Sequence, residues 1–185
     1  MTSGAHTLLT AAERRRVLGY VRGILSAACM GGGDPAVPDI PLLAEKGACF
    51  VTLRENGAMR GCIGTLEAFE PLAENLRRNA ENAAFSDPAF PPIEAGELDF
   101  ITIEITLLSP PRRLASPEAA ELGRDGLLLV CGARRAVFLP QVAAEQRWDH
   151  DAAWTNLARK AGLPPEAWRD AAAELYAFDC DTFGE

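Results

Sequence analysis

The sequence has few of the groups that metal sites and disulfide frameworks need. Its two histidines are His6 and His150, and no pair of cysteines has the Cys-x-x-Cys spacing. The five cysteines are an odd number and lie far apart: Cys29, Cys49, Cys62, Cys131 and Cys180. This pattern is not typical of a disulfide framework or a structural zinc site, and we expect no metal. Reduced thiols in a cytoplasm fit it best.

Basic charge is also scarce. Lys and Arg number 18 against 26 Asp and Glu, which gives a formal net charge of −8, and the Arg pairs are scattered. Anionic surfaces repel such a chain, so we expect neither nucleic acid nor a membrane surface as a partner. No apolar run approaches the roughly 20 residues of a membrane span, and the N-terminus has no signal-peptide pattern. The expected location is the cytoplasm.

The familiar catalytic signatures are missing as well. The sequence contains no Gly-x-Ser-x-Gly, no His-Glu-x-x-His and no calcium-binding loop. Residues 31–33 are three glycines, but no Gly-Lys-Ser/Thr follows them, so they indicate the end of a helix and not a phosphate loop. The sequence therefore predicts no cofactor.

What is present is enough for a folded core. The chain has 185 residues, of which 48% are apolar, a composition typical of a globular protein. A chain of this length can bury roughly 70% of the surface that its unfolded state exposes. We expect a single domain over residues 1–185. Whether part of the chain forms a small lobe is left open at this point.

The local patterns favour an α+β fold with a mainly antiparallel sheet and flanking helices. A capping box at Thr10–Glu13 opens a helix that ends at the three glycines, and Asn56-Gly57 is typical of a tight hairpin turn. Leu98–Leu108 alternates like a strand, with its isoleucines on one face. The other predicted elements are a helix after Pro71, a hairpin over 127–130 and 136–139, an interrupted helical region over 141–173, and a final strand over 175–180. Strands that come as hairpins indicate antiparallel pairing.

The segment Arg60–Gly64 is the strongest candidate for function. Two glycines flank Cys62 just after the predicted hairpin turn, and glycine inside a strand indicates a bulge or a close backbone approach. Arg60 shares strand parity with Cys62, so it can lower the thiol pKa or hold an anionic group. The alternative is that Cys62 is simply packed, since cysteine is among the most buried residue types.

Glu104 and His150 are the nearest candidates for proton transfer. Glu104 lies on the strand face opposite the isoleucines, where it either faces solvent or enters a polar cleft as a general base. His150 follows Trp148-Asp149 in a pattern typical of a helix start, which favours a surface role over that of a catalytic base.

Several motifs together resemble one family. Met59–Gly64 is similar to the Leu-Arg-Gly-Cys-Ile-Gly hallmark of the AMME-syndrome chromosomal-region family, whose prokaryotic members are named AmmeMemoRadiSam system protein A. Further segments match the family pattern: 50–53, 83–88, 103–105, 138–142, 148–149 and 160–163. The resemblance runs from about residue 10 to the C-terminus. Ala89 departs from it, because the family usually has an arginine there, and any ion pair of that arginine is lost.

This resemblance implies two lobes, with the hallmark near a cleft between them. It also implies two partners, a Memo-like protein and a radical S-adenosylmethionine (radical SAM) protein. Carried over by position, the candidate catalytic residues are Cys62, Arg60 and Glu104. The candidate ligand-binding residues are Gly61, Gly64, Asp87, Gln141 and Lys160.

Three hypotheses follow for the hallmark. In the first, the chain is an enzyme or catalytic subunit with Cys62 as a nucleophilic or redox-active thiol, acting on a small molecule or peptide. In the second, it is a non-catalytic ligand-binding or adaptor domain that docks the two partners. In the third, the hallmark is a folding element only. The sequence leaves open whether the chain is an enzyme.

Overall fold

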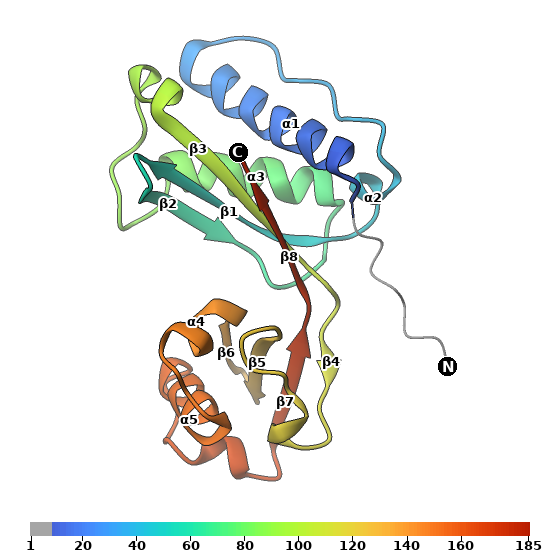
Figure 1. Cartoon of the computed structure of the whole chain (residues 1–185), viewed down its shortest axis with the longest axis vertical. Helices are drawn as coiled ribbons and strands as arrows, with labels where there is room; N and C mark the ends of the chain where they lie inside the picture. The colour runs from blue at the N-terminus through green and yellow to red at the C-terminus, as the bar shows by residue number, and fades with distance from the viewer. Residues whose placement is uncertain (1–8) are drawn as a thin grey trace. The chain divides into compact units, whose positions relative to one another are not determined.

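The computed structural model describes residues 9–185, so His6 lies outside the described residues. The chain divides into two compact units, which are described separately. Unit 1 is made of the chain up to Leu108 together with Asp181–Glu185, and unit 2 is Ser109–Cys180. Helices combine with two antiparallel four-stranded sheets (Figure 1), which confirms the predicted α+β class. The cleft that the resemblance implies stays a prediction.

Unit 1 contains a four-stranded sheet with the strand order β2-β1-β3-β8. Its helices are α1 (Ala11–Met30), α2 (Pro41–Ala44), α3 (Leu72–Phe85) and the 3-10 helix η1 (Ala95–Phe100). Its strands are β1 (Ala48–Glu55), β2 (Ala58–Gly64), β3 (Ile101–Leu108) and β8 (Cys180–Gly184). The capping box at Thr10 and the left-handed Gly31 bound α1 as the sequence predicts.

The core of unit 1 lies between one face of this sheet and the helices α1 and α3. Val51 and Leu53 of β1 and Ile103 and Ile105 of β3 are almost completely buried against apolar residues of these helices. The helix α3 packs against β1 and β2, and Figure 1 shows it behind the sheet. Among the described residues of unit 1, no helix packs on the opposite face of the sheet, called here the outer face. Because strand side chains alternate, every second residue of β1, β2 and β3 belongs to the outer face.

Unit 2 has its own sheet and its own core. The strand order is β4-β7-β5-β6, and Trp154, Leu157 and Trp168 fill the space beside Leu127 and Leu129. The strands are β4 (Arg112–Arg113), β5 (Gly126–Cys131), β6 (Arg134–Phe138) and β7 (Ala173–Phe178). The helices are η2 (Pro117–Ala119), α4 (Pro140–Glu145), α5 (His150–Lys160) and η3 (Ala167–Arg169).

The structure corrects some predicted boundaries. The strand predicted from Leu98 begins at Ile101, because a capping box between Glu94 and Glu97 starts the 3-10 helix η1 first. The predicted final strand, 175–180, is β7, and it is followed by β8, which belongs to the sheet of unit 1. No helix in residues 9–185 is long and apolar enough to cross a membrane.

Candidate functional site

Cys62 is part of a cross-strand row on the outer face of unit 1. Thr52 of β1 is paired directly with Cys62 on one side and with Glu104 on the other. The Thr52 Oγ1 and Cys62 Sγ atoms are 3.2 Å apart. Cys62 is half-buried, and Glu104 has 36% of its side chain exposed. The fold therefore gathers a thiol, a hydroxyl and a carboxylate in one row, which we call the Cys62 row.

Arg60 does not join this row. The register between β1 and β2 shifts at Leu53/Arg54, and Arg60 is the extra residue of the resulting β-bulge. Its guanidinium donates to both carboxylate oxygens of Glu97, at 2.8 and 3.2 Å, and to the carbonyl oxygens of Pro91 and Pro92. These bonds hold the pKa of the Glu97 carboxyl below its ordinary value. The guanidinium of Arg60 is thus used to attach the segment after α3 to β2.

Gly61 allows α3 to approach the sheet. A Cβ atom added at Gly61 would lie 2.1 Å from the carbonyl oxygen of Ala83, a backbone atom that has no room to move. Any side chain at this position would therefore push α3 away from β2. The hallmark glycine here serves packing between a helix and a strand.

Gly64 accommodates an aromatic ring. Phe50 is its partner on β1, and a Cβ at Gly64 would lie 2.2 Å from two carbon atoms of the Phe50 ring. The ring therefore covers the glycine backbone next to the Cys62 row. Covering a strand glycine with a cross-strand aromatic ring is a known way to stabilise a sheet.

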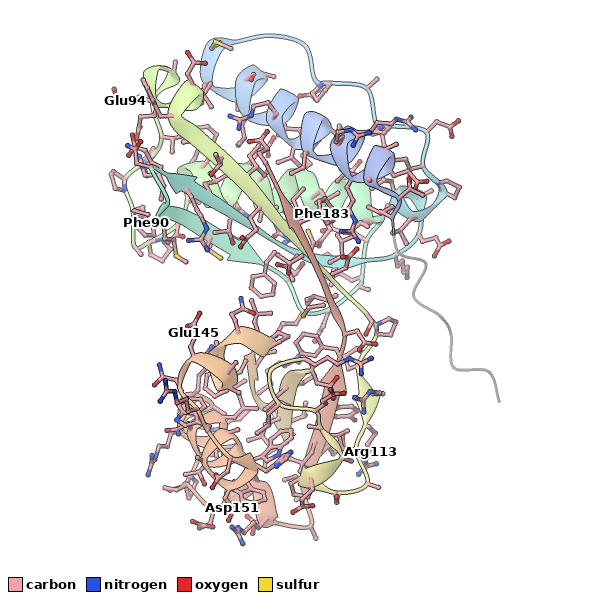
Figure 2. The ribbon with its side chains drawn as sticks, in the orientation of Figure 1. Phe90, Glu94, Arg113, Glu145, Asp151 and Phe183 are labelled. Atoms are coloured by element: carbon pink, nitrogen blue, oxygen red, sulfur yellow. The ribbon has the colours of Figure 1, made fainter. Side chains whose placement is uncertain are left out.

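Asp87 fixes the backbone of Cys62. Its Oδ2 atom accepts the Cys62 N–H at 2.8 Å, and its Oδ1 atom accepts the Ala89 N–H at 2.9 Å. Only 9% of Asp87 is exposed. The carboxylate thus satisfies an N–H at the free edge of β2 and forms the turn after α3. Phe90, labelled in Figure 2, lies in the segment that these bonds attach to β2.

Arg54 is the cation that the outer face does present. Its Nη2 atom is 3.6 Å from Glu104 Oε1, and 36% of each side chain is exposed. On the same face, Thr106 of the adjacent strand β3 and Thr182 of β8 share a hydrogen bond of 2.9 Å between their hydroxyl oxygens. Thr52 and Arg54 are the members of the site that the sequence reasoning missed. Strand alternation from Thr52 to Arg54 was the signal available for them.

The other thiols differ from Cys62 in their surroundings. Burial raises the pKa of the Cys49 thiol to about 12, and Cys49 is fully buried on the inner face beside Asn75 and Asn79. Burial also raises the pKa of Cys180 to about 12 and that of Cys29 above its ordinary value. These thiols serve as internal references for any experiment on Cys62.

The remaining predicted residues belong to unit 2. Gln141 is exposed on α4, and Lys160, at the end of α5, donates to the Val137 carbonyl oxygen at 3.0 Å. That bond covers an edge carbonyl of β6. Their predicted role in a site shared with Cys62 stays a prediction. His150 begins α5, as predicted, and its Nε2 atom lies 2.9 Å from the Ala120 carbonyl oxygen.

One hollow in unit 1 lies outside the Cys62 row. It has a volume of about 450 Å³ and is bounded by the loop before α2, by α2 and by the start of α3. Ile40, Leu43 and Ala73 are among its mostly apolar lining residues, and none of the row residues is. In the part of the chain that the structure describes, no group of three or more His, Cys, Asp or Glu residues is placed to hold a metal ion.

Comparison with known proteins assigns this fold and its hallmark segment to one protein family. The family model AMMECR1 matches residues 18–183, so the chain belongs to the AMMECR1 family. Protein MJ0810 of Methanocaldococcus jannaschii is 36% identical over 96% of this chain and 92% of its own length. A protein of Methanothermobacter thermautotrophicus is also 36% identical, over 94% of each chain.

The solved structures include a similar fold. The crystal structure of the uncharacterized protein PH0010 from Pyrococcus horikoshii aligns with a TM-score of 0.81 and 32% sequence identity. The alignment covers 91% of this chain and 89% of that one. The resemblance inferred from the sequence motifs is therefore confirmed at the level of the family.

Proposed function

We propose that the chain is a non-catalytic ligand-binding adaptor domain and that the outer face around the Cys62 row is its recognition surface. Its proposed protein partners are the Memo-like and radical SAM proteins that the family resemblance implies. The proposal rests mainly on one observation. Arg60, Gly61, Gly64 and Asp87 are engaged in backbone and packing contacts, which leaves the half-buried Cys62 side chain as the hallmark group on the outer face.

The surroundings of Cys62 favour binding over catalysis. A nucleophilic thiol is normally activated by a base within hydrogen-bond reach, about 2.6–3.2 Å. Glu104 is two strands away from Cys62, about 10 Å across the sheet at ordinary strand spacing. Arg60 directs its guanidinium to Glu97 and to two proline carbonyl oxygens instead of the thiol. The strand separation of Glu104 and the contacts of Arg60 therefore support the binding proposal.

The test is a binding experiment with the purified Memo-like and radical SAM proteins. We expect the double variant Arg54→Gln/Glu104→Gln to lose affinity by roughly tenfold or more, because it removes both charges of the surface. The matched control is Arg124→Gln/Glu121→Gln, which removes an exposed ion pair of 2.8 Å from unit 2. Both variants must give the unfolding midpoint of the wild type, so that a lost fold is not mistaken for lost recognition. Equal affinity of wild type and outer-face variant would refute the proposal.

The thiol enzyme is the second candidate, and the contact between Thr52 and Cys62 favours it. The hydroxyl lies 3.2 Å from the sulfur, so it can donate to a thiolate and stabilise it. In this role the Cys62 thiol would lose its proton to solvent, and the resulting thiolate would be a nucleophile toward a small molecule or peptide bound on the outer face.

The rate of Cys62 alkylation as a function of pH separates the two candidates. An inflection well below the unperturbed value of about 8.5 supports the enzyme, since thiolate is the reactive form. Turnover in a reconstituted assay with both partner proteins gives the second criterion. Unchanged turnover by the Cys62→Ser protein would refute the thiol-enzyme hypothesis and would be compatible with the adaptor function.

A further inference from the structure

We infer that the outer face binds a zwitterionic ligand of the α-amino acid type, with Arg54 holding its carboxylate and Glu104 its ammonium group beside the Cys62 thiol. This inference deepens the proposed function and rests on its assignment of the outer face as the recognition surface. It assigns the ligand class from the two charged groups that the face presents.

The charges of Arg54 and Glu104 have unused bonding capacity. The ion pair between them, at 3.6 Å, is longer than the 2.8 Å between Arg60 Nε and Glu97 Oε1. A guanidinium carries five donor hydrogens and a carboxylate accepts at both oxygens, so their single contact with each other uses only part of this capacity. A partly exposed and loosely paired couple contributes little to stability, and separating it for a ligand costs little.

Their placement suits a small zwitterion. Glu104 is paired with Thr52, and Arg54 is the next residue of β1 on the same face, so the two charges are diagonal neighbours on adjacent strands. Such neighbours lie about 7–8 Å apart at the backbone, within reach of long side chains. A carboxylate and an ammonium on one carbon atom can contact both charges at once. Cys62 is next to Thr52 in the same row, so the ligand side chain would lie near its thiol.

Other charges near the hallmark are engaged elsewhere. Arg60 bonds to Glu97, and Asp87 accepts two backbone N–H groups. A ligand with only one charge would leave either Arg54 or Glu104 without a new partner while breaking their contact. Charge complementarity therefore favours a zwitterion over a simple anion or a simple cation.

Thiol–disulfide exchange at Cys62 provides a direct test with known probes. The probes are L-cystine, with zwitterionic halves, cystamine, with cationic halves, and 3,3′-dithiodipropionate, with anionic halves. In each reaction the Cys62 thiol loses its proton to solvent and its sulfur attacks the probe. The probe S–S bond breaks, one half stays on Cys62 as a mixed disulfide, and the other leaves as a thiolate.

Rates are read at Cys62 by mass spectrometry on the native full-length protein. Each rate constant is divided by that for Cys62 in the urea-unfolded protein, which removes the intrinsic reactivity of the probe. We expect the normalised rate for cystine to exceed those for the other two probes by roughly three- to tenfold, as two weak ionic contacts allow. The Arg54→Gln/Glu104→Gln protein should show no preference, and the Arg124→Gln/Glu121→Gln control should keep it.

The outcomes separate this inference from the proposed function. Equal normalised rates for the three probes, or a preference that survives in the Arg54→Gln/Glu104→Gln protein, would overturn the zwitterion site. Loss of partner binding in that same variant would still support the outer face as a docking surface. A neutral reagent, iodoacetamide, must label Cys62 equally in all variants, so that a change in access is distinguished from a change in charge.

Discussion

Gly61 shows that helix packing alone requires a glycine at one hallmark position. Its missing side chain lets the Ala83 carbonyl oxygen of α3 come within 2.1 Å of the place where a Cβ would be. The sequence indicated a close approach of backbone or ligand at this glycine, and the structure identifies the approaching group as a helix. Periodicity cannot distinguish the two, because both need the same absence of a Cβ.

The Gly61→Ala substitution should destabilise the protein by about 1–3 kcal/mol, since overpacking against backbone has costs of this order. Denaturant unfolding measures it. The matched control is Gly19→Ala in α1, where a Cβ has nothing within 4 Å. That change should stabilise by roughly 0.5–1 kcal/mol, because alanine is the better helix former. Gly61→Ala protein as stable as the wild type would contradict the packing role.

The two cysteines with strongly raised pKa values, Cys49 and Cys180, should react slowly in the native protein. At pH 8.5, iodoacetamide should label native Cys49 and Cys180 at least about a hundredfold more slowly than Cys131, because burial raises both pKa values to about 12 and keeps the thiols protonated. Mass spectrometry of tryptic peptides gives each rate. All five cysteines should react at similar rates in urea. Rapid native labelling of Cys49 would show that this thiol is not enclosed by the core.

Among the elements, β2 is the one that the hallmark holds in place. It is an edge strand, and the segment after α3 is attached to it through Asp87 on the Cys62 N–H and through Arg60 on Pro91 and Pro92. A covered edge does not pair with other chains as an open one does. The hallmark therefore attaches the edge strand β2 to the segment after α3. The Cys62 side chain lies on the outer face.

The Asp87→Ala substitution should release the Cys62 amide hydrogen. Losing a buried acceptor has a cost of about 1–3 kcal/mol, so exchange of the Cys62 and Ala89 amides should accelerate by roughly ten- to a hundredfold. Native-state hydrogen exchange by NMR measures both. The Thr65 amide, which donates to Cys49, is the internal control, because Asp87 does not contact it. If the Cys62 amide exchanges no faster than in the wild type, Asp87 is not the group that protects it.

Elements with strong local sequence signals were predictable. Which charged residues lie beside the thiol was predictable only in part. The capping box at Thr10, the Asn56-Gly57 turn and the alternation of β3 each determine structure through neighbours in sequence. The strand glycines indicated a bulge or a close approach, but the position of the bulge at Arg60 depends on how two strands pair, which the sequence does not show. That is why Arg60 was expected beside the thiol, while Arg54, one strand away, is the cation on that face.

At the scale of the whole molecule, the chain builds two separate cores. One contains Leu53, Leu76 and Ile105 and belongs to unit 1, and the other contains Trp154 and Leu157 and belongs to unit 2. The return of β8 to the first sheet closes unit 1 with the last residues of the chain. Such long-range pairing was beyond the sequence analysis, because a five-residue strand carries no information about its distant partner.

Alkaline pH should weaken the whole fold through its buried thiols. The pKa of Cys49 is about 12 in the folded protein and about 8.5 in an unfolded chain. The unfolded state therefore releases this proton first, so the stabilisation is complete below pH 8.5 and is lost as the pH rises toward 12. One such group lowers the free energy of unfolding by up to about 1.4 kcal/mol per pH unit in this range.

Urea unfolding between pH 8 and 10.5 should show a shallower loss of the free energy of unfolding with pH for Cys49→Ala than for the wild type, whatever the stability of the variant at neutral pH. A Cys49→Ala slope equal to that of the wild type would mean that Cys49 does not contribute to it.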